Sequence, residues 1–168
     1  WAKHETWTIW KNLKKVFHSP KMESIISKEN FVYMNALYFN TNNMKEFYKL
    51  PNAKEVFLKN IELTKEVIQI IKPKRIICLS IPECFNRLNN GESKLMLSNK
   101  INLLVKGEFC GIPTYGIPHT SNNRKNQILP EDWPRIGYLL HNEFYGEDLL
   151  NMDLYLTEII EILKDLAN

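Results

Sequence analysis

A long amphipathic helix followed directly by an apolar strand is the feature that most constrains the fold. Residues 52–71 repeat apolar side chains at helical spacing, and Lys72-Pro73 ends the pattern. Asn52 suits the N-cap of this helix because Glu55 follows three residues later. Residues 75–81 then form a continuous apolar run, of the kind that parallel sheets bury on both faces.

Residues 31–38 form an earlier run, rich in aromatic and apolar side chains, and predict a buried strand. Strand, helix and strand together predict a βαβ unit, whose crossover is right-handed. Further strands are predicted at 102–109 and 114–117, and further helices at 5–17, 84–88, 133–144 and 152–166. We therefore expect an α/β fold, a three-layer α/β/α sandwich on a mostly parallel sheet of roughly four strands.

The composition is that of one globular domain. The 168 residues contain 44% hydrophobic and 24% charged residues, which excludes a disordered chain. Cys78, Cys84 and Cys110 show no paired spacing, so we expect reduced thiols and a cytoplasmic location. We also expect a monomer. No apolar stretch approaches the ~18 residues of a membrane helix, and no signal peptide is visible. Richness in Asn, Ile and Lys suits an AT-rich bacterial genome, and a net charge of +3 is compatible with a polyanionic partner.

Polar residues stand where the predicted strands end. Parallel sheets bind ligands outside the carboxyl ends of their strands, so we expect the segments containing Asn35, Ser80 to Glu83, and His119 to Asn122 to meet there. The Asn35 amide would either bond a neighbouring loop or present donors and an acceptor to a planar ligand. His119 is either an ordinary surface imidazole or a functional one, followed by small polar residues that suit a phosphate.

Other common kinds of site are not indicated. His4, His18 and His141 have no metal-ligand spacing with each other or with the cysteines, so no metal is expected. There is no P-loop and no Ser-His-Asp signature. Trp7 and Trp10 lie at helical spacing and are expected to pack against the domain rather than stack on bases.

Three stretches together resemble the uracil-DNA glycosylase superfamily over about residues 31–124. They are residues 32–37, residues 70–80 and residues 115–121. The resemblance implies hydrolysis of the N-glycosidic bond of uracil, or of a related damaged pyrimidine, in base-excision repair of DNA. It implies base flipping, DNA as the partner, and neither a metal nor an organic cofactor.

The resemblance also implies roles for individual residues. Asn35 would hydrogen-bond the flipped base, and His119 would stabilise the charge that develops on the pyrimidine O2. Ser121 would contact a backbone phosphate, with Thr120 and Arg124 in the same phosphate-binding loop.

The chain departs from the superfamily pattern at several positions. Thr120 and Asn122 replace the two prolines of the histidine loop, and Ser80 replaces a glycine. The Gly- and Pro-containing loop that positions the water is absent before Asn35, since the first glycine is Gly91. We expect either that a segment preceding Trp1 carried this loop, or that the chain is an inactive relative that binds nucleic acid or a nucleobase. A third interpretation is an unrelated α/β domain in which both Asn35 and His119 are structural.

Overall fold

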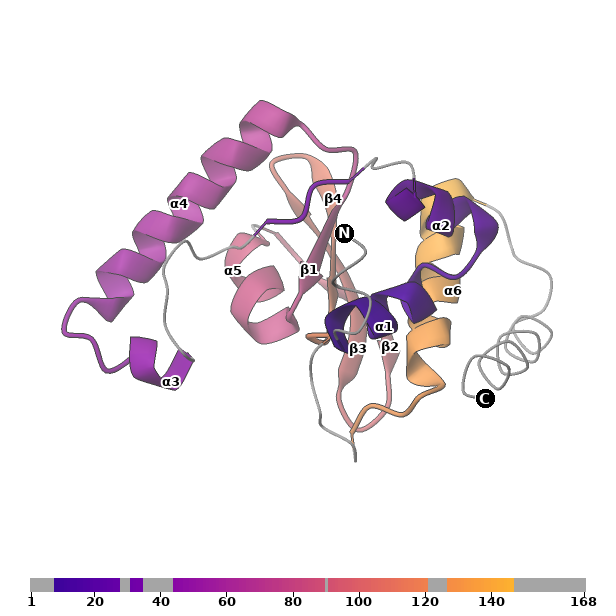
Figure 1. Cartoon of the computed structure of the whole chain (residues 1–168). Coiled ribbons are helices and arrows are strands. Elements are labelled where there is room, and N and C mark those ends of the chain that lie inside the picture. The colour runs from indigo at the N-terminus through magenta and orange to yellow at the C-terminus, as the bar shows by residue number, and fades with distance from the viewer. Residues whose placement is uncertain (1–7, 28–30, 35–43, 90, 121–126, 147–168) are drawn as a thin grey trace.

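The computed structural model describes residues 8–27, 31–34, 44–89, 91–120 and 127–146 (Figure 1). Its helices and strands are α1 (Thr8–Val16), α2 (Pro20–Ser27), α3 (Met44–Phe47), α4 (Ala53–Ile71), β1 (Ile76–Leu79), the π-helical turn η2 (Ile81–Phe85), α5 (Asn86–Leu88), β2 (Lys94–Ser98), β3 (Asn102–Phe109), β4 (Ile112–Ile117) and α6 (Asp132–Tyr145).

The strands form one open sheet of four, in the order β1-β4-β3-β2. β1 and β4 are parallel, with Ile76 opposite Thr114 and Leu79 opposite Ile117. β3 is antiparallel to both β4 and β2. For the strands that the structure describes, the prediction of a mostly parallel sheet is therefore wrong, because only one of their three pairings is parallel.

Short turns explain the antiparallel pairings. β3 and β4 are joined by Cys110 and Gly111, whose φ angles are 51° and 76°. Two successive residues with positive φ form a hairpin turn that matches the twist of the strands it joins. A two-residue loop can join only antiparallel strands, since parallel strands need a crossover of a dozen or more residues. Residues 99–101 likewise connect β2 to β3 over a short distance.

The segment 31–38, predicted as the first strand, is not a strand where the structure describes it. Residues 31–34 have no regular secondary structure, and Val32 and Tyr33 are 63% and 48% exposed. The prediction of a buried strand is wrong for these residues, and residues 35–38 lie outside the described part. Instead, Trp10 of α1 packs against Phe31 and Tyr33, with ring centroids 6.3 and 6.5 Å apart. Only the helix and second strand of the predicted βαβ unit are found in the described residues.

The observed helices agree with the sequence prediction better than the strands do. The helix predicted at 52–71 is α4, which begins after Asn52 and ends before Lys72 in the left-handed conformation. The Asn52 side chain makes no capping hydrogen bond. Helix α2 and strand β2 were not predicted, and the helix predicted at 152–166 lies outside the described residues. No described helix is long and apolar enough to cross a membrane.

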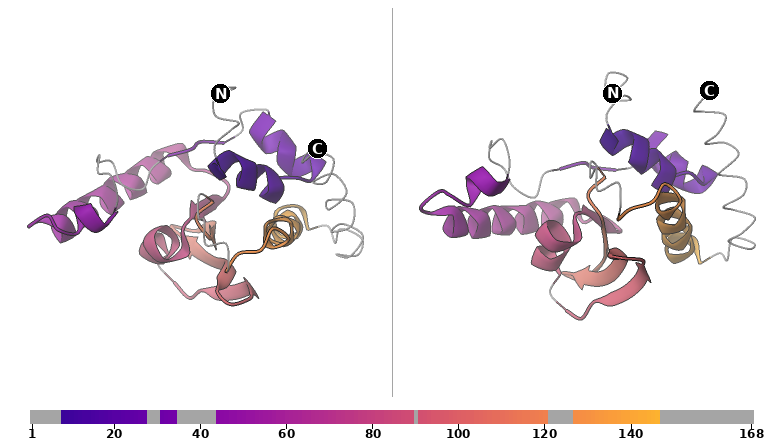
Figure 2. Two further views of the ribbon diagram at one scale, coloured as in Figure 1. Left: turned by 60° about the horizontal axis from the view of Figure 1, so that its bottom comes forward. Right: turned by 90° about the horizontal axis from the view of Figure 1, so that it is seen from below.

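Two hydrophobic clusters pack against the sheet. Helices α1, α2 and α6 contribute to one, and α3, α4, η2 and α5 contribute to the other. Along β3, Leu104 belongs to the first cluster and Val105 to the second. Figures 1 and 2 show α6 with α1 and α2 toward one side of the sheet, and α4 with α5 toward the other. The fold is mixed α/β with an open four-stranded sheet, and a sandwich of three layers stays a prediction.

Candidate functional site

The carboxyl ends of β1 and β4 lie side by side. Because Leu79 pairs with Ile117 in the last step of the parallel register, Ser80 and Pro118 leave the sheet at the same edge. The prediction that these two strand ends meet is confirmed. The third segment of that prediction contains Asn35, which lies outside the described residues.

On the β1 side, the chain turns at once into η2. Ser80 Oγ accepts a hydrogen bond from the Glu83 backbone N–H at 3.3 Å and caps this turn. The Phe85 N–H donates to Ser80 O at 3.0 Å, an i to i+5 bond of the π-helical kind that is frequent at functional sites. Tyr48 donates its hydroxyl to Glu83 Oε2 at 3.0 Å, and partial burial together with this carboxylate raises the pKa of Tyr48.

On the β4 side, Pro118 is followed by His119, whose side chain is exposed. Nearby chain segments still remove part of its hydration, and this desolvation lowers the pKa of His119 below its ordinary value of 6.5. The imidazole is therefore mainly neutral at pH 7, with one nitrogen that donates and one that accepts.

Thr120 anchors the loop that begins at His119. Its carbonyl oxygen accepts a hydrogen bond from Asn12 Nδ2 of α1 at 2.7 Å. Its side chain is 0% exposed, and no described residue offers its hydroxyl a hydrogen-bond partner. A buried hydroxyl in that state is uncommon. Ser121 and Arg124 lie outside the described residues.

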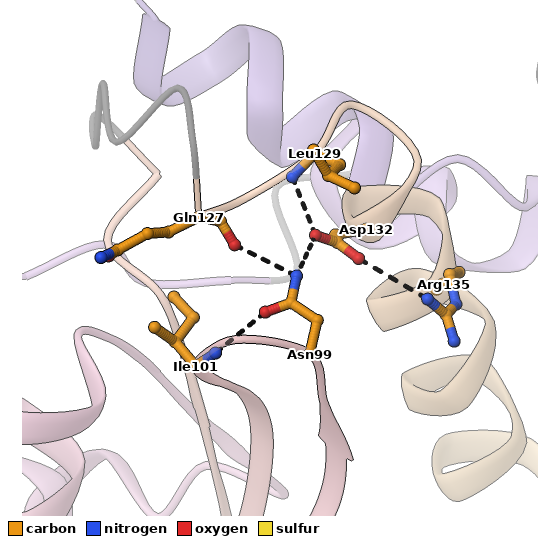
Figure 3. Close-up of polar contacts among 6 residues, drawn as sticks. All are labelled: Asn99, Ile101, Gln127, Leu129, Asp132 and Arg135. Atoms are coloured by element: carbon orange, nitrogen blue, oxygen red, sulfur yellow. Dashed lines mark hydrogen bonds and ion pairs between the residues drawn. The ribbon is translucent and has the colours of Figure 1, made fainter.

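The side-chain amide of Asn99, in the turn between β2 and β3, holds the chain at Gln127, directly after residues 121–126 (Figure 3). This turn lies at the same sheet edge as His119, because β3 runs antiparallel to β4. Asn99 Nδ2 donates to Gln127 O at 3.1 Å and to Asp132 Oδ2 at 2.6 Å. Asn99 Oδ1 accepts from the Ile101 N–H at 2.9 Å. All the strong hydrogen-bonding positions of the amide except one acceptor site are used.

The carboxylate of Asp132 completes this network. Its side chain is buried, with 1% exposure, and its Oδ2 also accepts from the Leu129 N–H at 2.8 Å. Arg135 Nη1 lies 3.7 Å from Oδ1. Both ends of the segment 121–126 are thus held by asparagine amides, one at Thr120 and one at Gln127. Sequence reasoning missed this network, although an Asn in a short turn and an Asp at the start of a helix are its usual local signals.

Two other polar clusters join α6 to its neighbours, one buried and one partly buried. Ser19 Oγ, which caps α2, is hydrogen-bonded to His141 Nδ1 at 2.7 Å. Glu143 pairs with Lys106 and accepts a hydrogen bond from the Tyr115 hydroxyl at 3.2 Å. Burial and the Glu143 carboxylate raise the pKa of Tyr115 to about 12. Both clusters link α6 to another element and are structural.

The described residues contain no group of three or more His, Cys, Asp and Glu side chains that could hold a metal ion. His4 lies outside the described part of the chain. Comparison of the chain with protein-family models, with curated proteins and with solved structures finds no match.

Proposed function

We propose that this chain is a DNA glycosylase-like protein that hydrolyses the N-glycosidic bond of uracil or of a related damaged pyrimidine in DNA. The observation that carries the proposal is the position of His119. His119 follows the carboxyl end of β4, which lies beside the carboxyl end of β1. Its side chain is exposed there, and its pKa is lowered. A neutral imidazole at the ligand-binding edge of a sheet suits a hydrogen-bond donor to a developing anion.

The chemistry of bond breaking explains why such a donor helps. The departing base acquires negative charge while the sugar becomes positive, and water then supplies a hydroxyl to the sugar carbon and a proton to the base. A neutral His119 N–H aimed at the pyrimidine O2 stabilises that negative charge in the transition state. One positioned donor of this kind is worth about 3–4 kcal/mol.

The remaining roles follow from the resemblance. Asn35 would recognise the flipped base, while Thr120, Ser121 and Arg124 would contact the backbone phosphates. Fixing Thr120 O and Gln127 O supports this assignment, because a loop with anchored ends loses less conformational entropy on binding. Binding energy from the phosphates would offset the few kcal/mol needed to unstack the base. We place the protein in the cytoplasm as a monomer in which helices cover both faces of the sheet to make three layers, working without metal or organic cofactor.

A second candidate function is binding of nucleic acid or a nucleobase without cleavage. The sequence favours it, because residues 1–34 contain no glycine and so lack the Gly- and Pro-containing loop that positions the water in the superfamily that the chain resembles. In that case the sheet edge would hold a base or phosphate, and His119 would act as a simple hydrogen-bonding group.

Excision of uracil from a labelled single-stranded oligonucleotide tests the proposal. The wild-type chain should yield alkali-labile sites, and His119→Ala should reduce the rate by about a hundredfold or more. His18→Ala is the matched control, since His18 follows the end of α1 and has no role in the proposed reaction, and it should retain full activity. Absence of excision by folded wild-type protein would reject the glycosylase and favour the binding function, which the same oligonucleotide tests by fluorescence anisotropy.

The pH dependence of excision provides a separate test of His119. Because its folded-state pKa lies below 6.5, the imidazole is neutral at pH 7 and becomes protonated only as the pH falls through that lowered pKa. A neutral donor predicts a rate that is flat through neutral pH and changes on the acid side, at the pKa that NMR titration assigns to His119. A rate that responds only above pH 7 would contradict this role.

A further inference from the structure

The exposed face of α1 carries a concentration of positive charge. Lys11 and Lys14 are exposed and Lys15 is half-buried, while Leu13 and Val16 occupy the buried face of the same helix. Residues 6–22 contain these three lysines and Lys21 but no acidic residue. This stretch is therefore strongly basic in a chain whose net charge is only +3.

The lysines of α1 differ from those of α4. On α4, Lys59 pairs with Glu55 and Lys65 pairs with Glu62, each at 2.8 Å. In the described part of the structure, neither Lys11 nor Lys15 forms an ion pair. These two lysines stand four residues apart, at a spacing where like charges destabilise a helix. The charges of Lys11 and Lys15 are thus left for something outside the described fold to neutralise.

The position of α1 links this charge to the candidate site. Asn12, next to Lys11 in sequence, holds Thr120 O at the start of the His119 loop. α1 is also fixed against α6, since a Cβ added at Gly137 would lie 2.2 Å from Val16 O. Figure 2 shows α1 and α2 beside α6, at the outside of the molecule. A polyanion lying on α1 would therefore be held at a constant distance from His119.

We propose that the lysine face of α1, defined by Lys11, Lys14 and Lys15, binds the phosphate backbone of DNA without regard to sequence. The choice of DNA rests on the proposed function, and the chemistry of the face agrees with it. Lysine ammonium groups bind phosphates as flexible point charges and release counterions when they do so. The exposed α1 positions bear Thr8 and lysines without a large apolar side chain, which does not suit insertion into a membrane surface. Lysine is also depleted in protein–protein interfaces.

The test measures binding of a uracil-free oligonucleotide, single-stranded and duplex, by fluorescence anisotropy over a range of salt concentrations. Lys11→Gln, Lys14→Gln and Lys15→Gln are combined in the full chain. We expect affinity near 0.1 M salt to fall by about ten- to a hundredfold. The slope of log affinity against log salt should become shallower by about 1 for each lysine that contacts a phosphate.

The matched control combines Lys54→Gln, Lys59→Gln and Lys65→Gln on α4, which removes the same charge. It should change the affinity and its salt dependence much less, because Lys59 and Lys65 already have carboxylate partners. Circular dichroism of each variant checks its fold, and the double variant Lys11→Gln and Lys15→Gln replaces the triple one should that fail to fold.

Equal losses from the α1 and α4 variants would overturn the assignment, since net charge alone would explain them. Wild-type chain that binds anionic vesicles of phosphatidylserine but no oligonucleotide would overturn it as well. The binding test of the lysine face can be distinguished from the excision test of the glycosylase. If DNA binding depends on the α1 lysines but no uracil is excised, the lysine face is supported and the glycosylase is rejected. If uracil is excised and the α1 variant binds DNA as tightly as the wild type, the glycosylase is supported and the lysine face is rejected.

Discussion

Asn99 holds three segments of the chain together at the sheet edge that bears His119. One amide bonds the turn between β2 and β3, the chain at Gln127 and the buried carboxylate of Asp132. Asn99→Ala removes all three bonds and leaves a buried carboxylate with fewer donors. We expect the free energy of unfolding to fall by about 1–3 kcal/mol, because a buried polar group without its partner loses its hydration without compensation.

Urea unfolding followed by circular dichroism measures this loss. Asn102→Ala is a suitable control, since Asn102 lies in the same region of the chain with an exposed side chain and should change stability by less than about 0.5 kcal/mol. Similar effects of both substitutions would mean that the amide network contributes little.

Residue-scale prediction from the sequence succeeds where a local pattern is sufficient. His119 was placed at a strand end by the apolar run before it and by Pro118, and the structure has it there. Asn99 and Asp132 were missed because their contact joins residues 33 positions apart. No local pattern reports which turn will lie against which helix.

At the scale of elements, the crossing of α1 and α6 depends on one glycine. Gly137 lies within α6, where glycine is otherwise unfavourable by up to about 1 kcal/mol, and its lack of a Cβ lets Val16 O approach. Gly137→Ala would place a methyl group 2.2 Å from that backbone oxygen. The two helices must then separate, and we expect a net destabilisation of about 1–3 kcal/mol despite the better helix propensity of alanine.

Thermal unfolding of Gly137→Ala beside Gly91→Ala measures this effect. A Cβ at Gly91 would meet nothing within 4 Å, so that substitution should leave the midpoint nearly unchanged. A Gly137→Ala variant as stable as the wild type would show that α1 moves away from α6 without loss.

The pairing of β3 shows what decided the strand directions. The strands predicted at 75–81, 102–109 and 114–117 are found as β1, β3 and β4, but apolar runs of this kind occur in parallel and antiparallel sheets alike. The two-residue turn at Cys110 and Gly111 set the direction of β4 relative to β3. A glycine as the second residue of a short loop between two strands was the sequence signal for this hairpin, and it outweighs the expectation based on buried apolar strands.

At the scale of the whole molecule, the packing of β3 predicts one cooperative unit. Leu104 and Val105 are adjacent in sequence but belong to the two different hydrophobic clusters. A disturbance of one cluster therefore reaches the other through the backbone of a single strand. Small domains whose parts share a core usually unfold in one step.

Substitutions in each cluster test this coupling. Leu104→Ala empties space in the cluster beside α6, and Phe57→Ala does so in the cluster beneath α4, at costs of about 2–5 and 3–5 kcal/mol. With Trp1, Trp7 and Trp10 replaced by Phe in every variant, tryptophan fluorescence reports on the first cluster through Trp133. Far-ultraviolet circular dichroism reports on the whole chain, including the long helix α4. If the domain is one unit, each substitution shifts both signals together to lower urea, and the two curves stay superimposed. If Phe57→Ala lowers the dichroism midpoint while the fluorescence midpoint stays in place, α4 unfolds separately, and the sheet edge bearing His119 is supported by α1 and α6 alone.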